Sequence, residues 1–233
     1  MVDSPPILDA HKIVETAERL RRRIEERFPD ASLASVAGDV QSVAERSAEL
    51  SERLARPLYW VRLAVFVLIL ALPVAIVWGL LMLSLPSHEF ADLADFLSVF
   101  LSAIETMVFL GAGIAFLITI ELRIKRSRVN SAVHELRALA HLVDSHQLSK
   151  DPIFLMKDTP TTRSSPIRDL DAFMLGRYLD YCSELLSLIG KIAALYGQNI
   201  QDSTALDSID RVETLTTGLS RKIWQKLSML RNL

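Results

Sequence analysis

The chain has 233 residues, half of them hydrophobic, and a formal net charge of −2. This balance gives no general attraction for nucleic acid, and no basic stripe with interleaved aromatic residues is present, so nucleic acid is not an expected partner. The single cysteine, Cys182, excludes an internal disulfide and a four-thiolate metal site within one chain. The apolar helical pattern around Cys182 predicts a small buried residue.

Two helices are predicted in the N-terminal segment, residues 1–57. The first carries apolar residues on one face and stops at Phe28, before Pro29. The second begins after Asp30, the expected N-cap, and repeats apolar residues at spacings of three and four, as in a coiled-coil seam. The expected seam residues are Ile13, Ala17, Leu20 and Ile24 in the first helix, and Leu33, Val36, Val40, Val43, Ser47, Leu50 and Leu54 in the second.

A transmembrane hairpin is predicted over residues 58–122. Residues 63–83 contain no charged residue, and residues 97–120 contain one, Glu105. At a rise of about 1.5 Å per residue, each run is long enough for a helix that crosses the roughly 30 Å hydrocarbon layer.

The orientation of this hairpin follows from the charges beside the two spans, because Lys and Arg collect on the cytoplasmic side. The segment between the spans has no Lys or Arg and holds Glu89, Asp92 and Asp95. We therefore expect a protein of the inner membrane with a short acidic external loop and both termini in the cytoplasm. The flanking basic residues are Arg46, Arg53, Arg56 and Arg62 before the first span, and Arg123, Lys125, Arg126 and Arg128 after the second.

Small residues recur every four positions on both spans. Such stripes allow helices to pack closely in lipid, so they predict the seam between the two spans. Pairing between two chains is the alternative that the spacing leaves open. The stripe residues are Ala71, Ala75 and Gly79 on the first span, and Gly111 and Ala115 on the second.

Glu105 is the ionisable residue inside a span, and such residues often mark a function because a carboxylate in lipid is costly. One interpretation is an ion or proton pathway in an oligomer. The other is a structural acid close to the outer interface, with the indole of Trp78 at similar depth as a candidate hydrogen-bond partner.

The C-terminal segment, residues 123–233, is predicted to be a cytoplasmic helical domain with a loop at about residues 149–169. Its first helix continues the second span to about Leu148, and its last begins near residue 203 with Asp207 in a capping box. The apolar "IFLM" in the loop is expected to dock onto the bundle or the membrane surface. Expected seam residues are Val129, Val133, Leu136, Ala140 and Val143, then Leu175, Tyr178, Cys182, Leu185, Ile189, Ile192 and Tyr196, then Ile209, Val212, Thr216, Leu219, Ile223 and Leu227.

A polar cluster lies between His134 and His146. His134 and His141 fall one residue beyond the apolar seam, on the solvent side, and lie about 10.5 Å apart along the axis, too far to share a metal ion. The cluster is therefore interpreted as the exposed face of a scaffold. Its candidate residues are His134, Glu135, His141 and Asp144.

The tetrapeptide "HELR" resembles the start of the phosphoacceptor motif of bacterial sensor histidine kinases. That resemblance implies phosphorylation of His134, with Glu135 as its acid–base neighbour. The chain has Ala138 and Leu139 where the motif normally has Thr-Pro.

The longer pattern, "HELRALAH" with "GRYLDYCSELLSL" and "TTGLSRKIWQKL", resembles uncharacterised bacterial two-span inner-membrane proteins. We expect an all-α, non-enzymatic membrane scaffold, with no catalytic residues, metal or cofactor. Its expected partners are the lipid bilayer and either a second copy or another protein bound through the cytoplasmic helices. The alternatives are phosphotransfer through His134 and an oligomeric ion or proton pathway through Glu105.

Overall fold

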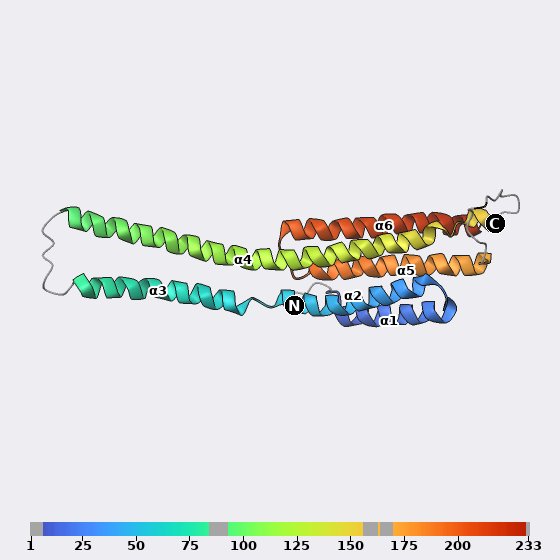
Figure 1. Cartoon of the computed structure of the whole chain (residues 1–233), viewed down its shortest axis with the longest axis horizontal. Coiled ribbons are helices and arrows are strands. Elements are labelled where there is room, and N and C mark those ends of the chain that lie inside the picture. Colours follow the sequence, from blue (N-terminus) through green and yellow to red (C-terminus); the bar gives the residue numbers. More distant parts are fainter. Residues whose placement is uncertain (1–6, 84–92, 156–162, 164–169, 232–233) are drawn as a thin grey trace, which may run out of the picture. The chain divides into compact units, whose positions relative to one another are not determined.

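The computed structural model describes residues 7–83, 93–155, 163 and 170–231. These residues form helices joined by short connections and contain no strand, which confirms the all-α fold class (Figure 1). The elements are α1 (Ala10–Arg27), α2 (Ser32–Ala55), α3 (Tyr59–Leu83), α4 (Leu93–Leu148), the 3₁₀ helix η1 (Pro152–Leu155), α5 (Ala172–Gly197) and α6 (Ser203–Arg231).

The chain divides into two compact units. The first, here called the helical bundle, comprises Met1–Ala55 and Arg126–Leu233, and the second, the apolar helix pair, comprises Arg56–Lys125. The N-terminal helices therefore pack into the same unit as the C-terminal region. α4 runs without a break from Leu93 to Leu148, so the expected continuation of the second span's helix is confirmed.

The helical bundle buries the apolar faces that the sequence spacing predicts. Ile13, Ala17, Leu20 and Ile24 are buried on α1, and α1 ends where expected, with Phe28 as its C-cap. Predicted core residues of α2, α4 and α6 are buried in the same cluster: Leu33, Val36, Val40, Val43, Leu54, Val129, Val133, Leu136, Ala140, Val143, Ile209, Val212, Leu219 and Ile223.

α6 begins at Ser203, as expected, but the two predicted capping residues are wrong. Asp30 does not cap α2, because it belongs to a tight turn in which the N–H of Ala31 donates to the carbonyl of Phe28, and α2 begins after Ala31. Asp207 does not form the start of α6. Asp202 takes that place, since its Oδ1 accepts a hydrogen bond of 2.9 Å from the backbone N–H of the third residue in the helix.

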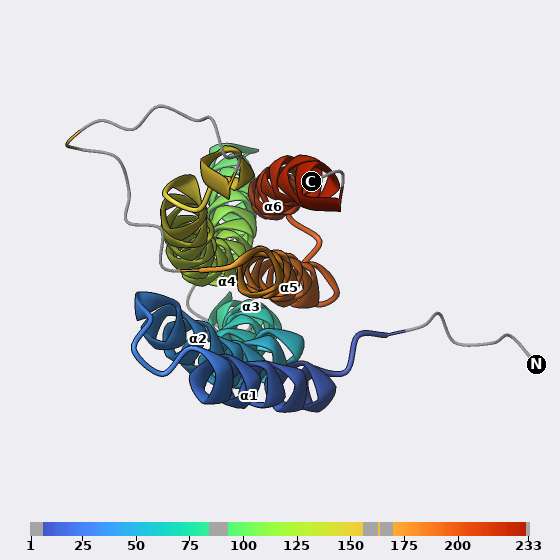
Figure 2. The ribbon, with the colours of Figure 1, turned by 90° about the vertical axis from the view of Figure 1, so that its right-hand side faces the viewer.

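α5 is the central helix of the bundle. It packs against α1, α2, α6 and η1, and Figure 2 shows it between α6 and the α1–α2 pair. The predicted seam of α5 is buried, but so are Leu179, Leu186 and Ala193, which lie off that seam. The Phe28 ring meets Tyr178 and Tyr181 edge-on, which joins the end of α1 to α5. A helix that is apolar on several faces must be covered on each of them.

The described beginning of the loop after α4 packs onto the bundle, which is one of the two positions expected for its apolar residues. η1 contacts α5 and α6, and Leu155 packs against the core.

The apolar helix pair consists of α3 and the part of α4 up to Lys125. Two contacts define its register: the backbone N–H of Leu58 lies 3.4 Å from Oε1 of Glu121, and a Cβ at Gly113 would lie 3.3 Å from Cδ2 of Leu68. Ten residues forward along α3 thus correspond to eight residues back along α4. The two helices are antiparallel. The acidic connection with Glu89 and Asp92 lies outside the described residues.

Candidate functional site

The most distinctive surface is the apolar exterior of the helix pair. Two helical stretches, Ser32–Ala71, which ends within α3, and Phe100–Leu148 of α4, are each long enough and apolar enough to cross a membrane. In the most apolar 18-residue windows, 11% of the first and none of the second is buried. Soluble monomers rarely expose contiguous apolar patches above a few hundred Å². Exposed side chains include Leu63, Phe66, Val67, Leu70, Val74, Val77 and Trp78 on α3, and Phe100, Leu101, Ile104, Met107, Val108, Phe109 and Phe116 on α4.

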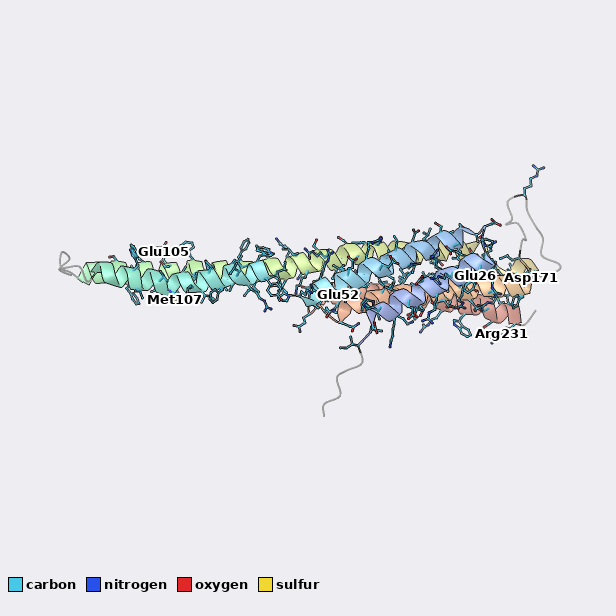
Figure 3. The ribbon with its side chains drawn as sticks, turned by 90° about the horizontal axis from the view of Figure 1, so that it is seen from below. Glu26, Glu52, Glu105, Met107, Asp171 and Arg231 are labelled. Atoms are coloured by element: carbon cyan, nitrogen blue, oxygen red, sulfur yellow. The ribbon has the colours of Figure 1, made fainter. Side chains whose placement is uncertain are left out.

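Glu105 lies within this surface. Its side chain is exposed and projects from α4 on the other side from Met107 (Figure 3). Trp78 lies ten residues beyond Leu68, so the antiparallel register places it opposite about residues 103–105, close to the level of Glu105. Among the described residues, no hydrogen bond or ion pair joins Glu105 to another side chain, so the pairing with Trp78 stays a prediction.

The small residues of the two spans are only partly described. A Cβ at Gly111 would meet no atom within 4 Å, whereas one at Gly113 would press on Leu68. The close approach in the described residues is therefore at Gly113, which the four-residue stripe did not contain. Ala71 and Ala115 stay predicted seam residues, and the side chains of Ala75 and Gly79 lie outside the described residues.

One end of the helix pair is held by a polar contact that the sequence analysis missed. Glu121 on α4 accepts from the N–H of Leu58, the residue just before α3, and lies 3.3 Å from Nζ of Lys125. The carboxylate satisfies one of the N–H groups left unpaired at a helix start. The i, i+4 spacing of Glu121 and Lys125 was visible in the sequence, but the partner on α3 was not.

The polar residues of α4 do not converge on one site. His134 and His141 are both exposed, as predicted, and Glu135 turns instead to α2, where Oε1 lies 2.5 Å from Nη2 of Arg46. Asp144 accepts a hydrogen bond of 2.7 Å from Gln147 within the same helix. In the described part of the chain, no group of three His, Cys, Asp or Glu side chains could hold a metal ion.

The C-terminal end of α4 is bound by α6. Nζ of Lys226 donates to the carbonyl of Gln147 at 2.7 Å and approaches that of Lys150 at 3.4 Å. The cation lies where helix carbonyls have no partner in their own helix. Partial burial lowers the pKa of Lys226, and Asp151 and Asp144 act in the opposite direction. This arrangement is a helix cap.

Two polar contacts, of which the first is buried, join α2 to the C-terminal end of α5 and to Asn199 just beyond it. The hydroxyl oxygens of Ser47 and Tyr196 lie 2.5 Å apart, and Nδ2 of Asn199 donates to Oγ of Ser51 at 2.9 Å. Ser47 and Tyr196 are each 1% exposed. Burial raises the pKa of Tyr196, while the hydrogen bond with Ser47 lowers it. Both residues were assigned to apolar seams, so their mutual contact was not foreseen.

A groove of about 800 Å³ lies between α5 and α6. Its lining includes the small residues Gly176, Ser183 and Ser187 and the large side chains of Phe173, which is 66% exposed, and Trp224, which is 58% exposed. Arg177 and Asp180 form an ion pair at its edge. Small residues between large apolar ones give the shape that receives a helix from a partner.

Comparison with known proteins adds no relative: no family model matches the sequence, and no curated protein or solved structure matches it.

Proposed function

We propose that the chain is a non-enzymatic integral protein of the inner membrane, in which the apolar helix pair crosses the bilayer and the helical bundle serves as an interaction module in the cytoplasm. The observation that supports this most strongly is the exposed apolar exterior of α3 and α4. Helices that are hydrophobic all round are covered either by protein or by lipid, and the described part of the chain leaves these two uncovered.

The proposed orientation has both termini in the cytoplasm and the connection between α3 and α4 outside. Basic residues flank both spans on the side of the termini, and the connection has Glu89, Asp92 and Asp95 but no Lys or Arg. A reporter that fluoresces only in the cytoplasm, fused to either terminus, should be active, and an export-dependent phosphatase at the same place should be inactive. Extraction of the untagged chain from vesicles by alkaline carbonate alone would contradict membrane insertion.

The proposed role of the bundle is to associate with a second copy or with another protein. Support comes from the groove between α5 and α6, where Phe173 and Trp224 remain exposed although most large apolar residues of the bundle are buried. Trp224→Glu should lower the fraction of crosslinked dimer in native membranes several-fold. Leu142→Glu, at an exposed position of α4, is the matched control. A lone monomer in detergent with no crosslinked partner in membranes would contradict this role.

Phosphotransfer through His134 can be separated from this proposal directly. His134 is exposed, but its neighbour Glu135 is held by Arg46. We expect no phosphorylation when the purified chain is incubated with a labelled phosphodonor. Label that disappears in His134→Gln would establish the signalling alternative instead.

A further inference from the structure

The basic residues beside the two apolar helices differ in whether a carboxylate holds them. Arg46, Arg53, Lys125 and Arg126 are each within ion-pair distance of an acid. Arg56, Arg62, Arg123 and Arg128 are exposed and, among the described residues, have no carboxylate partner; the first three belong to the apolar helix pair. Their charge is available to an external anion.

These three arginines lie at the same end of the apolar helix pair. The contact between Leu58 and Glu121 fixes where α3 and α4 meet there. Arg62 follows Leu58 by four residues, about 6 Å along the helix axis, and Arg123 follows Glu121 by two. Arg56 precedes Leu58 by two residues. Glu121 accepts from Leu58 and pairs with Lys125, and among the described residues it forms no ion pair with any of the three arginines.

Exposed aromatic residues occur at the same level. Tyr59 is 72% exposed and Trp60 is 54% exposed, both in the first turn of α3. Tyrosine and tryptophan are enriched where a membrane meets water, because the ring is apolar and its polar atom can be hydrated. We use the term basic belt for Arg56, Arg62 and Arg123 together with Tyr59 and Trp60.

We propose that the basic belt binds the phosphate groups of anionic phospholipids, such as phosphatidylglycerol, at the cytoplasmic interface. The proposal rests on the membrane insertion proposed above. Residues 56–62 and 121–125 contain four basic side chains and one acid, which gives a net charge of +3. A guanidinium matches a phosphate by two parallel N–H donors, and the adjacent lipid-facing surface places the headgroup beside it.

The preference of the basic belt for phosphatidylglycerol over phosphatidylcholine can be measured by the quenching of Trp60 fluorescence by brominated lipid. The other tryptophans, Trp78 and Trp224, are replaced by Phe so that emission comes from Trp60 alone. The full chain is reconstituted into bilayers with brominated phosphatidylglycerol or brominated phosphatidylcholine. We expect an association constant about 5-fold higher for the anionic lipid, the typical effect of one basic residue near an anionic surface. This preference should fall as salt is raised to about 0.5 M.

Replacing the three belt arginines with Gln should remove the preference, whereas replacing them with Lys should retain most of it. The control Arg19→Gln, Arg22→Gln, Arg53→Gln removes the same charge from exposed positions of α1 and α2 and should leave the preference unchanged. The proposal is overturned if the Gln variant keeps the preference, if the control loses it equally, or if millimolar inorganic phosphate abolishes it. A chain that does not float with vesicles would instead refute membrane insertion.

Discussion

The contact between Ser47 and Tyr196 allows the sharpest test of how the bundle is held together. The two hydroxyl oxygens are 2.5 Å apart, and each residue is 1% exposed, so water does not replace a lost partner. Ser47→Ala strands the phenol O–H and should cost about 2 kcal/mol, within the range for an unsatisfied buried group. Tyr196→Phe should cost about 1 kcal/mol, because a serine in a helix can turn its hydroxyl to a backbone carbonyl of the preceding turn.

The double variant separates this hydrogen bond from ordinary packing. Removing both hydroxyls leaves neither group stranded, so its cost should be about 1–2 kcal/mol less than the sum of the single costs. Thermal unfolding of the detergent-solubilised chain, followed by circular dichroism, should report about 2–4 °C per kcal/mol. Additive effects of the two substitutions would refute the reasoning.

The same pair predicts a response to alkaline pH. Burial raises the pKa of Tyr196, so folding favours its neutral form. The stability that the neutral tyrosine contributes is fully present below its pKa in the unfolded chain, about 10, and is lost as pH rises through its pKa in the folded protein. Tyr196→Phe lacks this group and should lose less stability than the wild type between pH 9 and 11.

Two further sites give matched comparisons. Gly113→Leu should reduce the free energy of unfolding by about 1–3 kcal/mol, because the new side chain must displace Leu68. Gly111→Leu, where no atom is near, should change it by no more than about 0.5 kcal/mol. Equal effects of the two substitutions in thermal unfolding would contradict the register of α3 and α4. Asp202→Ala should cost about 1 kcal/mol more than Asp202→Asn, because Asn still caps a helix. The pKa of Asp202 is lowered by its hydrogen bond with Arg126, so the stabilising charge is present above pH 3.8 and is lost as pH falls further through the folded value. The difference in melting temperature between the wild type and Asp202→Asn should therefore disappear in acid; a difference unchanged at pH 2 would show that the charge does not act.

The helix faces were predictable because local spacing decides them. Ile13 and Ile24 on α1, and Val133 and Val143 on α4, belong to the predicted apolar faces of their helices and are buried as expected. The burial of α5 on several faces was missed, because one apolar seam was sufficient to assign it as a helix.

Contacts between distant segments were not predictable from spacing. Glu121 meets Leu58, and Arg126 meets Asp202, across long stretches of sequence. A carboxylate can cap whichever helix start the fold brings near it, so neither partner has a local signature. On the polar face of α4, the sequence motif pointed to His134 as the site residue. In the structure it is the neighbouring Glu135 that forms an ion pair, with Arg46 of α2.

Cys182 gives the chain a built-in reporter of bundle opening. The thiol is 0% exposed on the central helix, and burial raises its pKa to about 12. Alkylating reagents attack the thiolate, so they must wait until α5 separates from its neighbours. Because the sequence has one cysteine, the rate of modification of the purified chain measures that separation without background from another thiol of the chain.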